Sequence, residues 1–274
     1  MPARLGAGAQ ATAPSAPQDG HAGRLEAGQV RVMFDRIAGV YDAMNTAMTA
    51  GLHHHWRARA ADLARVGPGS RVLDVASGTG DLAIELSGRV LPGGEVLGSD
   101  FAEGMLERAR AKVAAGAGGP EPPRFEWADA MELPYADGAF DAATVAFGAR
   151  NFEDLGRGLR EMTRVVRAGG RVVVLEITTP ARAPLSGFYA LWFDRIVPAL
   201  GQAVGVLTGG GAAGPGPGLA DAYTYLPSSV KRFPAPAELA AEMQRAGLVD
   251  ISYLVTAGGI VAIHAGTVAH GGGA

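Results

Sequence analysis

The sequence of 274 residues contains no cysteine. This absence excludes disulfide bonds, thiolate metal sites, iron–sulfur clusters and a cysteine nucleophile. Basic residues are not in excess either, because 24 Lys and Arg stand against 27 Asp and Glu. Such a chain lacks the positive surface that binds phosphate backbones, so we expect no nucleic-acid partner. No stretch reaches the ~18 apolar residues of a membrane-spanning helix.

Glycine and proline gather at a few places along the chain. Residues 1–28 are rich in Ala, Gly, Pro and Gln and lack the apolar run of a signal peptide, so we expect a disordered tail there. The block GGGAAGPGPG, residues 209–218, is expected to form a flexible loop. The hydrophobic content of 48% is ample for a buried core, and we predict one domain over residues 29–268.

Ahead of that loop, apolar β-branched runs alternate with helical patterns. The predicted strands are 71–76, 95–100, 124–129, 140–147 and 171–177, and the predicted helices are 80–89, 102–115 and 153–167, the last ended by Gly169 and Gly170. Strands this apolar are typical of a parallel sheet covered on both faces. Two later strands, 250–257 and 259–266, are too close together for a helix between them, so we expect an antiparallel pair. The predicted fold is α/β, with a doubly wound, mostly parallel sheet of seven strands.

The segment VLDVASGTGDLAIEL, residues 72–86, is the most informative one. Gly78 and Gly80 follow a predicted strand, and they allow a tight turn that a ligand can approach closely. The letters GTGDLA also fit the loose pattern G-x-G-x-x-A, a weak signal that purely structural turns share. Asp100 ends the next strand, 20 residues after Gly80, where a carboxylate can accept both hydroxyls of a ribose.

Two cofactor classes use this ribose geometry, nicotinamide dinucleotides and S-adenosylmethionine. Asp74 lies on the first strand, where it can meet the ammonium group of a methionine, whereas Asp74 and Asp81 would repel a pyrophosphate. Asp129 and Ala130 follow the third strand and can hydrogen-bond an adenine; a solvated loop is the alternative for Asp129. Together these residues favour S-adenosylmethionine, with a nicotinamide oxidoreductase as the alternative.

The chain resembles class I methyltransferases, with their Rossmann-like fold, and more narrowly the ubiquinone/menaquinone-biosynthesis C-methyltransferase family. The motifs that carry the narrower resemblance include FDRIAGVYDAMN (34–45), GLHHHW (51–56), FGARNFED (147–154), AYTYLPSSVKRFP (222–234) and TAGGIVAIHAG (256–266). The resemblance covers residues 30–268 and implies cofactor contacts at Thr79, Asp100, Asp129 and Ala130. Ala146 stands where some members have Ser, so a contact that needs this hydroxyl is lost.

The resemblance further implies methylation of a ring carbon in a prenylated quinol. Such a reaction needs a donor or cation for the phenolate and a base, which can act through water. Arg150 and Asn151 follow the fourth strand, and we assign the first to stabilise the oxyanion and the second to orient it. The alternatives are a surface ion pair between Arg150 and a nearby carboxylate, Glu153 or Asp154, and a helix N-cap for Asn151.

Tyr41 and Asp42 lie on a predicted N-terminal lid helix and are candidates for the donor or base, with packing against the lid as the alternative for Tyr41. The run His53-His54-His55 invites a metal site, but successive helical residues point about 100° apart, so we predict no metal. His264 is interpreted as a structural histidine in the last strand.

The apolar, aromatic segment 188–207 is predicted to pack in the core, with a prenyl tunnel or a bilayer contact as alternatives. We expect a cytoplasmic protein, peripheral to the membrane at most. A homodimer through the same segment is left open. The Gly/Ala/Arg-rich composition favours a demethylmenaquinol over a ubiquinone precursor by association only, and a non-catalytic cofactor-binding scaffold is a further alternative.

Overall fold

The computed structural model describes residues 27–180 and 219–270, with residues 187, 189, 191, 195 and 199 between them. The strands are β1 (Arg71–Val75), β2 (Glu95–Asp100), β3 (Arg124–Trp127), β4 (Phe140–Ala146), β5 (Val166–Ile177), β6 (Leu248–Thr256) and β7 (Val261–Val268). The helices are α1 (Ala27–Thr49), α2 (Leu52–Leu63), α3 (Asp81–Val90), α4 (Glu103–Ala114), α5 (Leu155–Val165), α8 (Leu219–Arg232) and α9 (Pro236–Arg245), with short 3₁₀ turns η1 (Ala149–Asn151) and η3 (Ala257–Gly259). The predicted loop 209–218 and nearly all of the predicted tail and of segment 188–207 lie outside the described residues.

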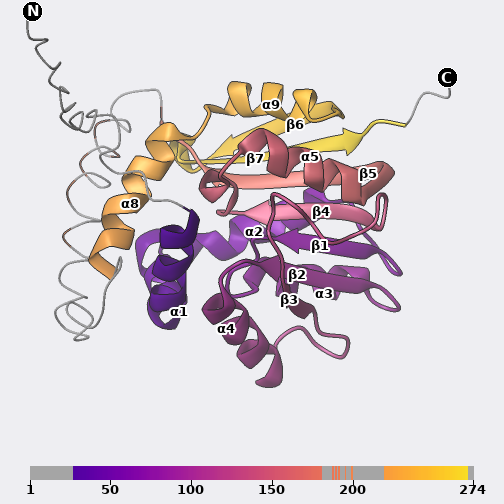
Figure 1. Cartoon of the computed structure of the whole chain (residues 1–274), viewed down its shortest axis with the longest axis horizontal. Helices are drawn as coiled ribbons and strands as arrows, with labels where there is room; N and C mark the ends of the chain where they lie inside the picture. The colour runs from indigo at the N-terminus through magenta and orange to yellow at the C-terminus, as the bar shows by residue number, and fades with distance from the viewer. Residues whose placement is uncertain are drawn as a thin grey trace, which may run out of the picture.

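The seven strands form one sheet in the order β3-β2-β1-β4-β5-β7-β6 (Figure 1). Strands β1 to β5 pair in parallel, whereas β7 pairs antiparallel with both β5 and β6. The predicted fold class, including the antiparallel pair at the end of the chain, is therefore confirmed. Helix α1 begins at Ala27, two residues inside the predicted tail.

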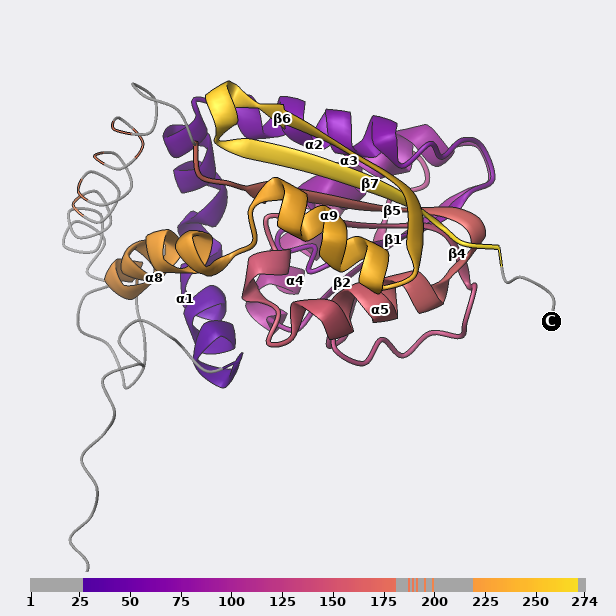
Figure 2. The same cartoon turned by 90° about the horizontal axis from the view of Figure 1, so that it is seen from above.

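Helices cover both faces of the sheet, with α2 and α3 on one side and α5 and α9 on the other (Figure 2). Alternate residues of the buried strands point to opposite faces of the sheet, and each face has its own apolar core. Val72 packs with α2 and α3, and Leu73 packs with α5 and α9. Because both faces are buried, the strands carry apolar residues on both sides, which is the continuous pattern seen in the sequence.

The boundary between α5 and β5 differs from the prediction. Helix α5 ends at Val165, and β5 already begins at Val166, so Gly169 and Gly170 lie within the strand and do not terminate the helix. Gly169 has a positive φ of 76°. A Cβ atom on Gly170 would lie 2.5 Å from the main-chain oxygen of Asp141. These glycines therefore allow β5 to pack closely against β4 at a point where the pairing of the two strands is irregular.

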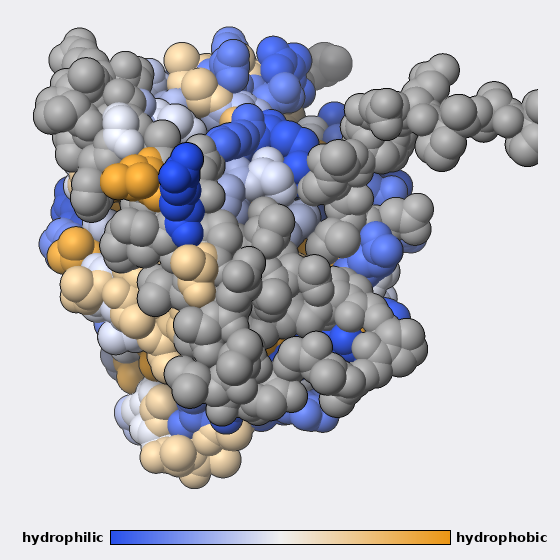
Figure 3. All heavy atoms as spheres, turned by 90° about the vertical axis from the view of Figure 1, so that its left-hand side faces the viewer, coloured by the Kyte–Doolittle hydropathy of each residue, from blue (hydrophilic) through white to orange (hydrophobic). Residues whose placement is uncertain are grey.

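Helices α1 and α8 lie side by side, apart from the two layers that cover the sheet (Figure 1). They share with helix α4 an apolar cluster that includes Met33, Ile37, Met105 and Tyr225. Figure 3 looks onto this side of the molecule, where apolar residues gather along one margin beside polar ones. Within the described part of the chain, no helix combines the length and apolar character that crossing a bilayer demands.

Candidate active site

A cleft opens where the carboxyl ends of β1, β2, β3 and β4 meet helix α1. Residues of four loops line it, together with two aromatic side chains of α1. The lining residues include Asp74, Ser77, Gly78, Thr79, Asp100, Phe101, Asp129, Ala130, Phe147 and Asn151 from the sheet edge, and Phe34 and Tyr41 from α1. All cofactor residues predicted from the sequence line this cleft except Gly80, which lies in the turn itself.

The turn between β1 and α3 is held open by its two glycines. Gly78 and Gly80 have φ values of 56° and 83°, in the region that favours glycine. A Cβ atom on Gly80 would lie 2.5 Å from the Phe125 ring, so this position has no room for a side chain. The main-chain N–H of Gly78 donates to Asp100 Oδ2 at 2.8 Å and so joins the turn to the end of β2.

Asp100 is buried at the end of β2, with one main-chain hydrogen bond on each carboxylate oxygen. Besides the bond from Gly78, the N–H of Ala102 donates to Oδ1 at 2.9 Å. Burial raises the pKa of Asp100 to about 6, although these main-chain donors oppose the shift. Each oxygen keeps a second lone pair, so the carboxylate can still accept hydrogen bonds from a ligand diol.

Asp74 lies deeper in the cleft and is fully buried. The Thr144 hydroxyl donates to its Oδ1 at 2.7 Å, whereas its Oδ2 has no hydrogen-bond partner among the described residues. Burial raises the pKa of this carboxyl to about 7. A buried oxygen without a partner is costly, and it marks a place where a positively charged ligand group would be stabilised.

The predicted contact of Asp74 with a ligand ammonium implies a pH-dependent affinity. The ionised carboxylate attracts a ligand ammonium, so below pH 7 binding must displace a proton. We expect the affinity for S-adenosylmethionine to fall between pH 7.5 and 5.5, by up to about tenfold per pH unit, in calorimetric titrations. Protonation of a carboxyl whose pKa is raised by folding stabilises the folded state, so this loss does not arise from unfolding at Asp74.

Asp74→Asn is expected to bind more weakly at pH 7.5 and to lose most of this pH dependence. The exposed Glu121 is a suitable control, because Glu121→Gln removes a carboxylate remote from the cleft. A wild-type slope in Asp74→Asn would show that another group carries the effect.

The remaining predicted cofactor residues lie at the rim and in the wall of the cleft. Asp129 is exposed and accepts a hydrogen bond from the N–H of Met131 at 2.8 Å, while Ala130 is half-buried beside it. The Thr79 hydroxyl is already engaged, because it donates to Asp42 Oδ1 at 2.6 Å and accepts from Lys112 Nζ at 3.0 Å. The hydroxyl could donate to a cofactor only if Asp42 gave up its hydrogen bond, whereas its second lone pair can still accept one.

Asp42 does not line the cleft, although we expected it to reach in as a donor or base. Its carboxylate holds Thr79 through Oδ1 and pairs with Lys112 Nζ through Oδ2 at 2.7 Å. It lines neither the cleft nor the cavity described next. Asp42 is thus a contact between α1 and the glycine turn. Lys112 was not singled out in the sequence, because a lysine near the end of a helix has no local signal of such a role.

A second, larger cavity of about 560 Å³ adjoins the cleft. Its walls are mostly apolar and come from α1, α2, α8 and the loops after β4 and β5. They include Met33, Ile37, Met48, Trp56, Leu226 and Ile260, with Arg150 and Tyr225 among the polar residues. Phe34, Tyr41, Phe147 and Asn151 line both spaces, so a ligand in one lies next to a ligand in the other.

Arg150 forms a buried ion pair with Glu176, so the alternative of a surface ion pair with Glu153 or Asp154 is wrong. Arg150 Nη1 donates to Glu176 Oε2 at 2.9 Å, and the two side chains are only 6% and 2% exposed. Glu176 also accepts the main-chain N–H groups of Arg150 and Ile177. Burial disfavours the charge on Arg150, but Glu176 outweighs this and raises the pKa of the guanidinium. Arg150 Nε is buried without a partner among the described residues.

Glu176 is a site residue that the sequence interpretation missed. A signal was present, since this glutamate ends the otherwise apolar run VVVLE at the carboxyl end of a strand predicted to be buried. A buried carboxylate is expected to have a cationic partner.

Asn151 does not cap a helix, because Asp154 is the residue that accepts a hydrogen bond from the first turn of α5. Its Oδ1 instead accepts a hydrogen bond from the Tyr225 hydroxyl at 3.2 Å. Tyr41 packs edge-on against Phe34, with ring centroids 6.2 Å apart, and lines both cavities. Tyr41 therefore combines the packing role with access to both spaces.

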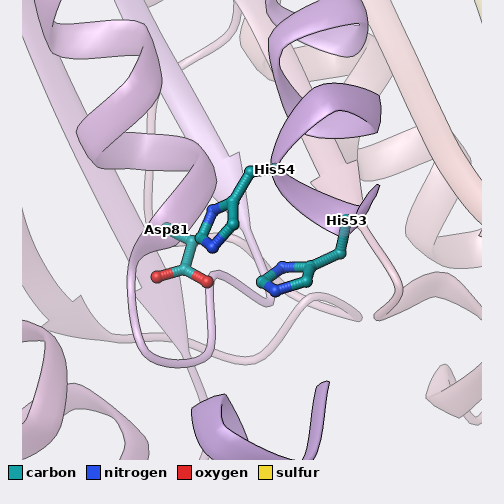
Figure 4. A group of neighbouring side chains, drawn as sticks. All are labelled: His53, His54 and Asp81. Carbon is teal, nitrogen blue, oxygen red and sulfur yellow. The ribbon is translucent and has the colours of Figure 1, made fainter. Parts of the chain in front are cut away.

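His53 and His54 come closer together than expected from their positions on a helix. Their ring centroids are 3.9 Å apart, and they face Asp81 at the start of α3, with possible ligand atoms within 4.8 Å of one another (Figure 4). However, Asp81 already pairs with Lys112 Nζ at 2.6 Å and with Arg57 Nη1 at 3.4 Å. Burial and then Arg57 lower the pKa of His53 to about 4. Two resident cations oppose a third, so we keep the prediction of no metal.

His264 lies outside both cavities. Its Nε2 is 2.8 Å from the Pro236 carbonyl oxygen, and its ring stacks on Tyr253. These contacts agree with the structural role predicted for it.

A family model described as the ubiE/COQ5 methyltransferase family matches residues 23–268. A demethylmenaquinone methyltransferase from Thermus thermophilus is 46% identical over 234 residues, which are 85% of this chain and 99% of the relative. A ubiquinone/menaquinone biosynthesis C-methyltransferase from Geobacter sulfurreducens is 38% identical, with 87% of this chain and 88% of the relative covered.

Solved structures share the fold at lower identity. A SAM-dependent methyltransferase from Aquifex aeolicus has a TM-score of 0.51 and 18% identity, covering 74% of this chain and 84% of that one. A putative methyltransferase from Bacillus halodurans has a TM-score of 0.54 and 16% identity, covering 78% of this chain and 99% of that one.

Proposed function

Because the chain belongs to the ubiE/COQ5 methyltransferase family, we propose that it methylates a ring carbon of demethylmenaquinol to form menaquinol in menaquinone biosynthesis. It is an S-adenosylmethionine-dependent C-methyltransferase. The observation that carries the choice of substrate is the near-complete match to a relative named for demethylmenaquinone. The mostly apolar cavity, whose polar groups include Arg150 and Asn151, is structural support for this choice of substrate.

The residues of the cleft fit the cofactor. Asp100 would hold the ribose hydroxyls, Asp74 the ammonium group, and Asp129 with Ala130 the adenine, while the turn of Gly78 and Gly80 leaves space for the ligand. The buried, unpartnered Oδ2 of Asp74 supports this assignment, because a cation there would satisfy it. When bound, S-adenosylmethionine supplies an electrophilic methyl group on its sulfonium.

The residues of the larger cavity would bind and activate the quinol. Arg150, held by Glu176, keeps its charge and donates hydrogen bonds to the oxygen of the ionising hydroxyl, which makes the neighbouring ring carbon more nucleophilic. Asn151 adds a second polar group at the boundary with the cleft. Tyr41 is positioned to contact the ring from α1. Mostly apolar walls exclude water and hold the ring in place, and positioning of this kind supplies much of the rate of a displacement reaction.

A ubiquinone precursor is the second candidate substrate, because relatives such as the one from Geobacter sulfurreducens are named for both pathways. A prenylated substrate would partition into a membrane. We therefore propose that the protein works in the cytoplasm at the inner face of the membrane.

The proposal predicts methyl transfer that can be followed directly. The purified protein, given S-adenosylmethionine with a labelled methyl group and demethylmenaquinol, should form labelled menaquinol. In a bacterial strain that lacks its own enzyme and accumulates demethylmenaquinone, the gene should restore menaquinone. Transfer only to a benzoquinol precursor would favour the ubiquinone alternative. Binding of NADH with no binding of S-adenosylmethionine would overturn the proposal.

A further inference from the structure

Tyr225 reaches the active site from α8, far along the chain from the loop that carries Asn151. Its hydroxyl donates to Asn151 Oδ1 at 3.2 Å, and both residues line the 560 Å³ cavity. Tyr225 is only 9% exposed, and the hydrogen bond itself is partly buried. The contact matters because an asparagine side chain can turn either its oxygen or its NH₂ group toward a ligand.

The two partners themselves determine the direction of this hydrogen bond. An amide oxygen only accepts, so the phenol donates its proton to Asn151 Oδ1. Burial raises the pKa of Tyr225, so the phenol retains that proton at neutral pH.

With its oxygen engaged in this way, the Asn151 side chain has its NH₂ group left to donate. We propose that Tyr225 is a positioning residue, which fixes the Asn151 amide so that Asn151 and Arg150 both present donors to the quinol oxygen. A site with two donors and no acceptor favours a phenolate over a neutral hydroxyl, because the charged oxygen accepts both bonds. This inference rests on the proposed function and assigns to α8 a part in it.

Tyr225→Phe removes only the phenol oxygen and should keep the packing of the ring. We expect kcat for quinol methylation to fall about tenfold, with the affinity for S-adenosylmethionine unchanged. Because phenolate formation on the enzyme becomes less favourable, the acidic limb of the kcat profile, which reports ionisation in the enzyme–substrate complex, should move up by as much as about one pH unit. Tyr253→Phe, on strand β6 and outside both cavities, is the matched control and should behave as wild type.

A double-mutant cycle separates this role from a structural one. If Tyr225 acts through the amide, Tyr225→Phe should have little further effect in an Asn151→Ala background. An equal tenfold loss in both backgrounds, or wild-type kcat and pH profile in Tyr225→Phe, would overturn the inference. Asn151→Asp should be less active than Asn151→Ala, because its second oxygen would repel the phenolate; full activity of Asn151→Asp would also contradict the inference.

A measurement without substrate keeps this test apart from the proposed function. In protein labelled with ¹⁵N-asparagine, the side-chain signal that disappears in Asn151→Ala should shift and exchange faster with water in Tyr225→Phe, and stay unchanged in Tyr253→Phe. An unchanged signal in Tyr225→Phe would refute the positioning role. A shifted signal in a protein that does not methylate demethylmenaquinol would instead refute the proposed substrate and leave the contact intact.

Discussion

Arg150→Ala is expected to lower kcat for quinol methylation by about two to three orders of magnitude, as loss of a preorganised oxyanion donor does in other enzymes. The guanidinium is buried, is held by Glu176, and retains a buried Nε without a partner among the described residues. Arg150 lines the quinol cavity but not the cofactor cleft, so the affinity for S-adenosylmethionine should change little. Single-turnover rates and calorimetric titration measure the two effects separately.

Two further variants make this result interpretable. Arg150→Lys keeps a positive charge without the planar fork, and we expect it to retain an intermediate rate. Arg160→Ala removes an exposed arginine of α5 and should leave kcat unchanged. Full activity of Arg150→Ala, or its full complementation of menaquinone synthesis, would remove the role assigned to this residue.

Glu176→Gln is expected to reduce the free energy of unfolding by about 3–5 kcal/mol, because it leaves the buried charge of Arg150 without a counter-charge. The amide oxygen can still accept main-chain N–H groups, so the substitution mainly removes the charge. Urea unfolding followed by circular dichroism measures the loss. A reduction below about 1 kcal/mol, as for an exposed ion pair, would contradict this account of the pair.

The double variant Arg150→Met/Glu176→Gln separates stability from activity. Without either charge, the site no longer holds an unpaired ion, so the double variant should be more stable than Glu176→Gln alone. It should nevertheless remain as inactive as Arg150→Ala, because the donor is absent. Recovery of activity together with stability would show that the pair serves only the fold.

The sheet could be predicted from the sequence because each buried strand is a short apolar run between turn signals. The end of α5 could not, since Gly169 and Gly170 also fit a helix terminus. Only the tertiary contact with Asp141 shows that they lie inside β5. Helices α8 and α9 were not predicted, although the sequence of α8 was part of the resemblance. Pro227 within α8 weakens a helical signal read from the sequence alone.

The cofactor residues were recognised because they follow strand ends, which parallel pairing brings to one edge of the sheet. The partner of Arg150 was missed for the same geometric reason. Ala146 pairs with Leu175 across β4 and β5, so Glu176 comes to the edge beside the loop of Arg150, although 26 residues separate the two in sequence. Glu153 and Asp154, which are close to Arg150 in the sequence, suggested a local ion pair. The register of β4 and β5 instead brings Glu176 next to Arg150.

The direction of β7 determines where the protein can be attached to other molecules. The end of β7 pairs with the start of β5, so the chain leaves the sheet at the edge opposite to both cavities (Figure 1). A fluorophore, surface tether or fusion partner placed after His270 would project away from α1 and α8. An attachment ahead of Ala27 would begin beside those helices. Immobilisation through the carboxyl-terminal side therefore leaves the side with α1 and α8 accessible in surface-based binding assays with lipid vesicles.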